Sequence, residues 1–310
     1  MRGAPDLRHA AEWAGDPVAE ARSFWAAHAA HQVPETLQAI RARTALAPRL
    51  AIVLGSGLGG VADAIDIAHG GAAFATTDLP HWPPSTVLGH AGKLVLGHWQ
   101  GVPIAGLAGR IHFYEGYGLD RVTFPVRVFH ALGARVLVLT NAVGAIRRGL
   151  APGSVLLVRD QLNFHGTRGL FLPGELPPAG DRGPFGARPV YAPRLAGVLR
   201  RAAQAIDLAL PEGILMGGAG PAYESAAEVR AAHDWGADAA CMSTVSEAVV
   251  GAGLGLEVAA LSCVTNAATG LSATPLTHRE VTEVADRVAL SLRRLLETAL
   301  PELVGNLPTE

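Results

Sequence analysis

Four short segments of this chain combine glycines with polar side chains, and each follows an apolar run. They read GSGLGG at 55–60, GRIHFYEGY at 109–117, AGPAYES at 219–225 and CMSTVSE at 241–247. In α/β folds, loops that follow apolar strands form the edge of the sheet where ligands bind. The segments supply a hydroxyl in a glycine turn, an arginine and a histidine two residues apart, a carboxylate beside an aromatic ring, and a serine that opens a helix. Such a set suits a phosphate anion lying next to a neutral, hydrogen-bonding ring.

The glycine turn after the first apolar run has two functional interpretations. Gly55, Gly57 and Gly60 satisfy the G-x-G-x-x-G fingerprint of dinucleotide-binding folds. That fingerprint needs an acidic residue about 20 residues later, at the end of a second strand. Asp78 has the spacing, but it lies in the turn-forming segment TTDLPHWPP. In the other interpretation the turn is a phosphate loop, with the Ser56 hydroxyl beside inward-facing backbone N–H groups. A tight turn that binds nothing also fits, so the motif alone leaves all three open.

Arg110 and His112 are two residues apart, so they lie on one side of an extended segment. Arginine binds phosphate through paired hydrogen bonds, and a neighbouring histidine can add a donor. Tyr114 shares that side and can close over a sugar, while His90 in GHAGK offers a further donor in a glycine turn. A surface ion pair and ordinary loop histidines are the structural alternatives.

Two further segments place backbone or hydroxyl donors where an anion could bind. The run RVLVLT at 135–140 is followed by Asn141, Ala142 and small residues that let a backbone N–H approach an anion. Ser243 precedes a capping box formed by Thr244 and Glu247, so it lies at the positive end of a helix. A plain strand-to-helix turn and local capping are the alternatives.

A second group of residues suits a flat heterocycle. Glu224 follows Tyr223, so a carboxylate that accepts N–H donors lies beside a ring that can stack. Asn266 ends an apolar run and can both donate and accept at a ring edge, and His278 opens the last helix. Glu224 also suits the N-terminal dipole of the next helix, Asn266 can simply terminate its strand, and His278 can be a surface residue.

The composition limits the class of protein. Of 310 residues, 49% are hydrophobic and 17% charged, which is typical of a globular chain. A formal net charge of −2 without a long basic block argues against nucleic-acid binding. Apolar stretches fall short of the ~18 residues of a membrane span, and the N-terminal segment lacks a signal-peptide core. We therefore expect a cytoplasmic protein with neither a nucleic-acid nor a membrane partner.

The cysteine and histidine content bears on metals and cofactors. Two cysteines cannot form a disulfide framework or a four-thiolate zinc site. The 12 histidines show no clustered ligand spacing such as HExxH. The sequence therefore predicts neither a metal nor a cofactor.

Apolar periodicity predicts the elements that position these residues. Strands are expected at 50–54, 135–140, 154–159, 213–216 and 256–265, with two more within 87–107. Helices are expected at 17–43, 120–132 and 193–208, after the capping boxes at Ser225 and Thr244, and after a third box at Thr277. Segment 166–193 is rich in glycine and proline and shows no periodicity. The pattern predicts an α/β fold: a flexible tail at 1–16, then a single domain at 17–310 with a mixed, largely parallel central sheet flanked by helices.

From about residue 50 to residue 283 the chain resembles the trimeric, low-molecular-mass purine nucleoside phosphorylases. The resemblance rests on LGSGLGG, GHAGK, GRIHFYEGY, TFPVRVFHALG, TNAVGA, AGPAYES, MSTVSE and VTNAA in the family's order. It implies a nucleoside phosphorylase-like fold and purine salvage by reversible phosphorolysis. The substrates would be 6-oxopurine (deoxy)ribonucleosides such as inosine and guanosine, and the products the free base and (deoxy)ribose 1-phosphate. Inorganic phosphate would be the co-substrate, no cofactor would be needed, and the assembly would be a homotrimer.

The resemblance also implies a role for each candidate residue. Phosphate would be held by Ser56, His90, Arg110, His112, the backbone of Ala142, and Ser243. The ribose would be lined by Tyr114, Met242 and His278. Tyr223 would stack on the purine, Glu224 would accept from its N1–H side, and Asn266 would bond N7 and the 6-oxygen. Asn266, His112 and Glu224 are thereby the implied catalytic residues.

The chain departs from the family pattern at three positions. Ser246 stands where the family usually has proline, and Tyr223 where it has phenylalanine. Thr167 stands where the family has an aromatic residue that enters the neighbouring subunit's site, and Phe164 or Phe171 could replace it.

Other functions remain open beside the one that the resemblance implies. A xanthosine or methylthioadenosine phosphorylase is the nearest alternative. From other classes, a nicotinamide-dependent oxidoreductase built on the glycine turn and a catalytically inactive nucleoside-binding module remain.

Overall fold

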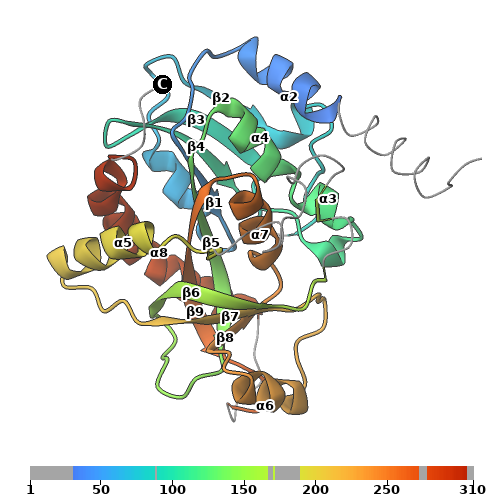
Figure 1. Cartoon of the computed structure of the whole chain (residues 1–310), viewed down its shortest axis with the longest axis vertical. Coiled ribbons are helices and arrows are strands. Elements are labelled where there is room, and N and C mark those ends of the chain that lie inside the picture. The colour runs from blue at the N-terminus through green and yellow to red at the C-terminus, as the bar shows by residue number, and fades with distance from the viewer. Residues whose placement is uncertain (1–30, 88, 167–169, 172–188, 272–277, 306–310) are drawn as a thin grey trace, which may run out of the picture.

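The computed structural model describes residues 31–87, 89–166, 170–171, 189–271 and 278–305 (Figure 1). Within 278–287, only Val284 has its side chain described as well as its backbone. The expected tail at 1–16 and most of the loop at 166–193 lie outside the described residues, so those two predictions stay untested. The expected helix at 17–43 is described only from residue 31, where it contains α2 (Gln32–Arg41).

One sheet of nine strands runs through the described part of the chain, in the order β2-β3-β4-β1-β5-β8-β7-β6-β9. The strands are β1 (Leu50–Leu54), β2 (Ala72–Ala75), β3 (Lys93–Trp99), β4 (Val102–Ala108), β5 (Val136–Ala145), β6 (Val155–Asn163), β7 (Glu212–Gly217), β8 (Ala239–Cys241) and β9 (Glu257–Ala267). Parallel pairing joins β4, β1, β5 and β9 and also β6, β7 and β8, whereas β2, β3 and β4 form an antiparallel meander. Because β5 also pairs with β9, strands β5, β8, β7, β6 and β9 close on themselves.

The central strands are buried on both faces, which explains why they read as continuous apolar runs. Along β5, Val136 and Val138 enter one hydrophobic core, and Leu137 and Leu139 enter the other. Helices α4 (Phe124–Leu132) and α7 (Val245–Gly253) cover the second of these faces, with α2 packed on α4. Helices α5 (Pro193–Ala205) and α8 (His278–Leu303) pack together on the first (Figure 1). The expected α/β fold with a central sheet flanked by helices is confirmed.

The short helices complete the fold. They are α3 (Leu119–Val122), α6 (Ala226–Asp234), and the 3-10 helices η2 (Gly59–Ala64), η3 (Thr76–Asp78) and η4 (Phe113–Glu115). Helix α6, at the bottom of Figure 1, follows the predicted capping box between Ser225 and Glu228. The box between Thr244 and Glu247 likewise opens α7. Thr277 of the third box lies outside the described residues.

Three expectations about the elements were wrong. The helix expected at 120–132 is split into α3 and α4 at Thr123, where the backbone leaves the helical region, and Pro125 lies in the first turn of α4. Strand β5 continues to Ala145 instead of ending at Asn141, because it gains β8 and β9 as partners. Strands β2 and β8 were missed, since short alanine-rich segments such as AAFA and AAC carry no strand pattern.

No helix within the described residues is both long and apolar enough to cross a bilayer.

Candidate active site

The candidate residues follow strands whose carboxyl ends meet. Strands β4, β1, β5 and β9 are parallel neighbours, so the segments after them converge. Strand β8 is antiparallel to the end of β5, so the segment that follows β8 runs back beside β5. The residues brought together on these elements are Ser56 after β1, Arg110 and His112 after β4, Ala142 in β5, Ser243 after β8 and Asn266 in β9.

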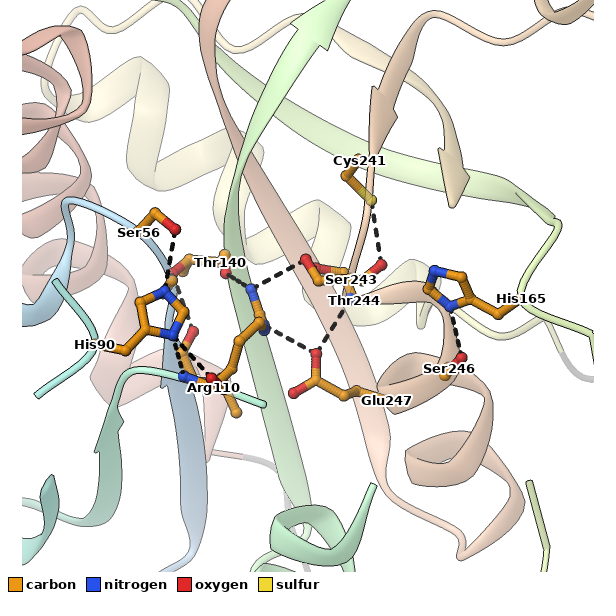
Figure 2. Close-up of polar contacts among 12 residues, drawn as sticks. Ser56, His90, Arg110, Thr140, His165, Cys241, Ser243, Thr244, Ser246 and Glu247 are labelled. Atoms are coloured by element: carbon orange, nitrogen blue, oxygen red, sulfur yellow. Dashed lines mark hydrogen bonds and ion pairs between the residues drawn. The ribbon is translucent and has the colours of Figure 1, made fainter. Parts of the chain in front are cut away.

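Arg110 lies at the centre of the predicted phosphate side and is 3% exposed. Its Nη1 donates to Thr140 O at 2.6 Å and reaches Ser243 Oγ at 3.5 Å. Its Nη2 lies 3.0 Å from Glu247 Oε2 in a buried ion pair (Figure 2). Within the described residues, Arg110 Nε and Nη2 make no well-aligned hydrogen bond. The guanidinium is therefore held in place by its neighbours, and two of its nitrogens are buried with hydrogen-bonding capacity left unused.

Glu247 is a site residue that the sequence reasoning missed. Its position predicted only a helix cap, and Glu247 Oε2 does lie 3.2 Å from Thr244 N. The same carboxylate is 2% exposed and carries the charge opposite Arg110. The sequence held a signal for this role: α7 reads VSEAVVGAG, and a carboxylate in so apolar a helix requires a partner.

Ser243 is presented by a strained turn at the start of α7. Thr244 has φ 66° and ψ −51°, and Val245 N donates to Ser243 O at 2.6 Å. This is a γ-turn with positive φ, which is rare and strained. A β-branched residue in such a conformation costs about 1–3 kcal/mol and persists only where its surroundings enforce it. Strain of this kind gathers at functional sites, and here it fixes the hydroxyl that faces Arg110.

His90 joins the glycine turn to the arginine segment (Figure 2). Its Nε2 lies 3.0 Å from Ser56 Oγ, and its Nδ1 lies 3.0 Å from the N atom and 2.8 Å from the O atom of Arg110. Burial lowers the pKa of His90, and the Arg110 charge lowers it further against the opposing effect of the Arg110 carbonyl. The ring is therefore neutral at pH 7 and links Ser56 to Arg110.

His112 is buried between His90 and Tyr114, with ring centroids 5.0 Å and 4.7 Å away. Burial lowers the pKa of His112 to about 3, with Arg110 and His90 adding to the effect. Its Nδ1 lies 3.1 Å from Glu115 Oε1. A carboxylate only accepts, so Nδ1 carries the hydrogen and Nε2 of the neutral ring is an acceptor. The sequence suggested a donor to phosphate, whereas in this tautomer Nε2 can accept a hydrogen bond from the O–H of a phosphate.

Glu115 is a second site residue that the sequence did not single out. It lies within GRIHFYEGY, ends η4 and accepts hydrogen bonds from His112 N at 2.6 Å and Thr86 Oγ1 at 2.8 Å. Burial acts to raise the pKa of Glu115, but the hydrogen bonds from Thr86 and His112 outweigh it, so the pKa is lowered. The ionised carboxylate thereby holds the His112 ring in one tautomer.

The loop after β7 carries Tyr223 and Glu224 against the predicted ribose residues. Gly220 has φ 64°, and a Cβ there would lie 2.6 Å from Met242 Sδ and 2.8 Å from Tyr114 Cδ1. Only glycine lets the loop pass so close to Met242 and Tyr114. Tyr223 itself is 58% exposed.

Glu224 lies on the same loop, in a less polar setting than Glu115. Burial raises the pKa of Glu224, its own backbone N–H opposes the rise, and the charge of Glu228 adds to it.

In the pairing of β5 with β9, Asn266 lies opposite Gly144 and Ala142 lies opposite Cys263, with an irregularity between Val143 and Gly144. Asn266 Nδ2 donates to Ala267 O at 2.8 Å, and its Oδ1 accepts from Thr265 Oγ1 at 2.7 Å. Both amide atoms therefore have local partners that a bound ring would have to share or replace. His278 is the first residue of α8, but its side chain lies outside the description.

The dinucleotide interpretation of the glycine turn is wrong. Strand β1 is followed by the 3-10 helix η2, so no α-helix N-terminus is available for a pyrophosphate. Asp78 follows β2, an edge strand that β3 and β4 separate from β1. Gly55 has another reason to be glycine: a Cβ there would lie 2.7 Å from Thr140 O and 3.0 Å from Arg110 Nη1. The turn therefore packs against the arginine site.

In the part of the chain that the structure describes, no group of three or more His, Cys, Asp and Glu side chains could hold a metal ion. Cys241 and Cys263 are buried free thiols, and burial raises the pKa of each to about 12. Neither thiol is therefore a nucleophile near neutral pH.

Comparison with known proteins agrees with this geometry. The family model described as "Phosphorylase superfamily" matches residues 49–301. Purine nucleoside phosphorylase 1 of Geobacillus stearothermophilus is 37% identical over 274 residues, which cover 88% of this chain and 98% of that protein. Purine nucleoside phosphorylase 1 of Bacillus subtilis (strain 168) is 38% identical, covering 82% of this chain and 92% of that protein.

Solved structures give the same result. The crystal structure of Schistosoma mansoni purine nucleoside phosphorylase in complex with adenosine superposes with a TM-score of 0.76 at 28% identity, covering 90% of this chain and 98% of that one. A schistosome purine nucleoside phosphorylase in complex with hypoxanthine superposes with a TM-score of 0.77 at the same identity and coverage. The chain therefore belongs to the phosphorylase superfamily, among the purine nucleoside phosphorylases.

Proposed function

We propose that this chain catalyses the reversible phosphorolysis of 6-oxopurine ribo- and deoxyribonucleosides, as a pentosyltransferase. The products are the free purine base and the pentose 1-phosphate. The observation that carries the proposal is the buried Arg110, held by Thr140, Ser243 and Glu247 beside two neutral histidines. The site offers a phosphate anion a positive charge, hydroxyls and a hydrogen-bond acceptor, and the loop that carries Glu224 lies next to it.

Two kinds of group bind phosphate: one supplies positive charge, and the others supply hydrogen-bond donors that fix the orientation of the anion. Arg110 supplies the positive charge through its remaining N–H groups, and the hydroxyls of Ser56 and Ser243 and the N–H of Ala142 supply directed donors. His90 keeps the Ser56 hydroxyl in place. His112 Nε2 accepts a hydrogen bond from the O–H of monohydrogen phosphate, which orients the anion while the ring stays neutral.

Base recognition follows from the chemistry of Glu224. Hypoxanthine and guanine present an N1–H that the carboxylate accepts, whereas adenine presents a lone pair. A buried acceptor left unpaired costs ~1–3 kcal/mol, and more when it is charged. Tyr223 stacks on the ring, and Tyr114, Met242 and His278 enclose the sugar. Inosine and guanosine are therefore cleaved much faster than adenosine.

The reaction needs no covalent nucleophile. The bond from C1′ to N9 breaks with its electron pair going to the base, and the sugar passes through an oxocarbenium-like transition state. The phosphate anion beneath C1′ stabilises the cation, an oxygen of monohydrogen phosphate bonds to C1′, and Asn266 stabilises charge at N7. Both effects are electrostatic stabilisation by groups already in place. The departing base takes up, by way of solvent, the proton that the phosphate gives up on becoming a monoester. The donors come from separate segments of protein, so no metal or cofactor is required.

An inosine cleavage assay with and without phosphate tests the proposal. Release of hypoxanthine should require phosphate and should persist in EDTA. Release at full rate without phosphate, or loss of activity in EDTA, would contradict the mechanism. Parallel assays with xanthosine, methylthioadenosine and adenosine separate the alternative phosphorylases, since comparable kcat/KM for adenosine would remove the assigned role of Glu224. Binding of inosine without turnover would identify an inactive binding module.

We also propose a closed homotrimer. Phe164, which begins the loop after β6, is 48% exposed and stacks on Trp235, which is 62% exposed, at 5.5 Å between ring centroids. Exposed aromatic pairs are enriched at interfaces, and a cyclic trimer lets each such loop reach the next subunit. Phe171 instead packs against the core, while Thr167 lies outside the described residues. Light scattering should give three times the 32.0 kDa chain mass. A fully active monomer would overturn the proposal that the loop after β6 reaches the next subunit's site.

A further inference from the structure

His165, in the loop after β6, is hydrogen-bonded at both ring nitrogens. Nδ1 lies 2.7 Å from Ser246 Oγ (Figure 2), and Nε2 lies 2.7 Å from Gly218 O. The Phe113 ring lies parallel to it at 6.4 Å between centroids, with 24° between the ring planes. The imidazole thus contacts three segments that are far apart in the sequence.

The partners define the protonation of the ring. A peptide carbonyl only accepts, so Nε2 carries the hydrogen and donates to Gly218, while Nδ1 accepts the Ser246 hydroxyl. Burial lowers the pKa of His165, and the Gly218 carbonyl only partly opposes this. The ring is therefore a neutral bridge with one donor and one acceptor, each used.

The two ends of this bridge belong to different halves of the active site. Gly218 begins the loop after β7 that carries Tyr223 and Glu224, here called the base loop. A Cβ on Gly218 would lie 3.3 Å from Glu224 Oε1, and Gly218 N donates to Cys241 O at 2.8 Å. Ser246 is the second residue of α7, directly before Glu247, which is paired with Arg110. His165 therefore ties the loop of the base-recognising carboxylate to the helix behind the phosphate site.

Ser246 supplies the hydroxyl that the bridge needs at the α7 end. The resemblance described above places proline at this position, and proline has no hydroxyl to donate. With serine, α7 acquires a donor that is 1% exposed and is satisfied by the imidazole.

We propose that His165 is a positioning residue for nucleoside recognition, which holds Gly218 and thereby sets where Glu224 meets the base. The assignment rests on the proposed function, because it takes Glu224 as the acceptor of a purine N1–H. It concerns the base and the sugar but not phosphate, since the bond from His165 Nε2 ends on the base loop.

Two substitutions at this position separate the two bonds. In His165→Gln the side-chain amide reaches about as far as Nε2 and can still donate to Gly218 O. In His165→Asn the shorter amide reaches only the Nδ1 position and can keep Ser246 alone. Ser246→Ala removes the other end of the bridge. The matched control is His69→Ala, which changes an exposed histidine whose ring contacts Asp66 within the described residues.

Steady-state kinetics with inosine and phosphate varied separately give the readout. We expect His165→Asn to raise the KM for inosine about tenfold with the KM for phosphate within twofold of wild type. His165→Gln and Ser246→Ala should raise the inosine KM less than threefold, and His69→Ala should match wild type. Equal effects of Gln and Asn, a parallel rise in the phosphate KM, or no change in any variant would overturn the assignment. A fall in Tm common to all the site variants without the KM split would show a merely structural role.

Calorimetric binding of free hypoxanthine and adenine keeps this test distinct from that of the proposed function. If the wild type cleaves no inosine yet binds a purine base, the proposed function fails, and the Asn variant must still bind that base about tenfold more weakly than the Gln variant. If wild type binds neither base, both proposals are overturned.

Discussion

Arg110 is 3% exposed and ion-paired with Glu247, whereas Tyr223, at the other end of the same site, is 58% exposed. The phosphate side is built from side chains fixed by one another: His90 by Arg110, His112 by Glu115, and Arg110 by Glu247. The base side is a loop, tied down through Gly218 and packed at Gly220.

This difference suits the two ligands that we propose. Phosphate carries a charge whose binding depends on donors held at the correct distance before it arrives, because reorganising dipoles costs energy. A neutral purine gains mainly from apolar contact and a few directed hydrogen bonds, which a loop can supply once it closes on the ring. Substitutions on the phosphate side should therefore affect both stability and phosphate KM, and those on the base side should affect substrate choice.

The largest effect is expected for Arg110→Ala. The variant loses the charged phosphate contact and leaves Glu247 buried without its partner, which typically costs 3–5 kcal/mol of stability. The KM for phosphate should rise at least ~100-fold, and the Tm should fall. Adding Glu247→Gln should recover most of the Tm but not the phosphate KM. Recovery of both would show that the arginine acts only through folding.

Glu224→Gln should change substrate choice and leave stability nearly unaffected. An amide can turn its NH2 toward the adenine N1 lone pair, while an inosine N1–H then loses a charged acceptor. We expect kcat/KM for inosine to fall about 10- to 100-fold and the preference over adenosine to shrink or reverse, with the phosphate KM within twofold. An unchanged ratio of kcat/KM for inosine over adenosine would place Glu224 outside the base site.

The low pKa of His112 predicts how stability depends on pH. Its pKa is about 3 in the folded state and about 6.5 in an unfolded chain, so below pH 6.5 the unfolded state binds a proton that the folded state does not. Stability is then lost as pH falls, by up to about 1.4 kcal/mol per pH unit for this group.

Urea unfolding at one protein concentration between pH 6.5 and 5 measures this slope. His90 adds to it with its own lowered pKa, and Glu115, whose pKa is lowered from 4.5, contributes only below this window. His112→Gln should remove one group's share of the slope. Equal slopes in the variant and the wild type would mean that His112 titrates normally in the folded protein.

The smallest effect concerns the strained turn at Thr244. Both variants lose the hydroxyl, but glycine adopts positive φ without strain, whereas alanine keeps the strain. Thr244→Gly should therefore be more stable than Thr244→Ala by about 1 kcal/mol. Both variants should have a higher KM for phosphate than wild type, because Ser243 is less firmly held. The Tm of the two variants gives the comparison; an alanine variant as stable as the glycine variant would mean that the turn relaxes when the threonine is removed.

The sequence by itself determined the class of fold and the segments that meet at the candidate site. Strand β1 was predicted to the residue, and the capping boxes at Ser225 and Thr244 were predicted correctly, because these depend on local patterns that the folded chain keeps. The order of GSGLGG, GRIHFYEGY, AGPAYES and CMSTVSE along the chain sufficed for the family, since each motif is contiguous. The boundaries of β5 and the existence of β8 were beyond it, because both depend on pairing between distant strands.

Only the tertiary structure decided what each side chain does within the site. Nothing local marks Glu247 as the partner of Arg110, because the two residues are 137 positions apart. Nothing local marks His165 as the bridge from Ser246 to Gly218 either, because these residues lie 81 and 53 positions from it. The tautomer of His112 likewise follows from the position of Glu115 and from burial, which sequence periodicity does not measure. Charge, burial and hydrogen-bond direction are properties of neighbours in space, so they appear only when the strands converge.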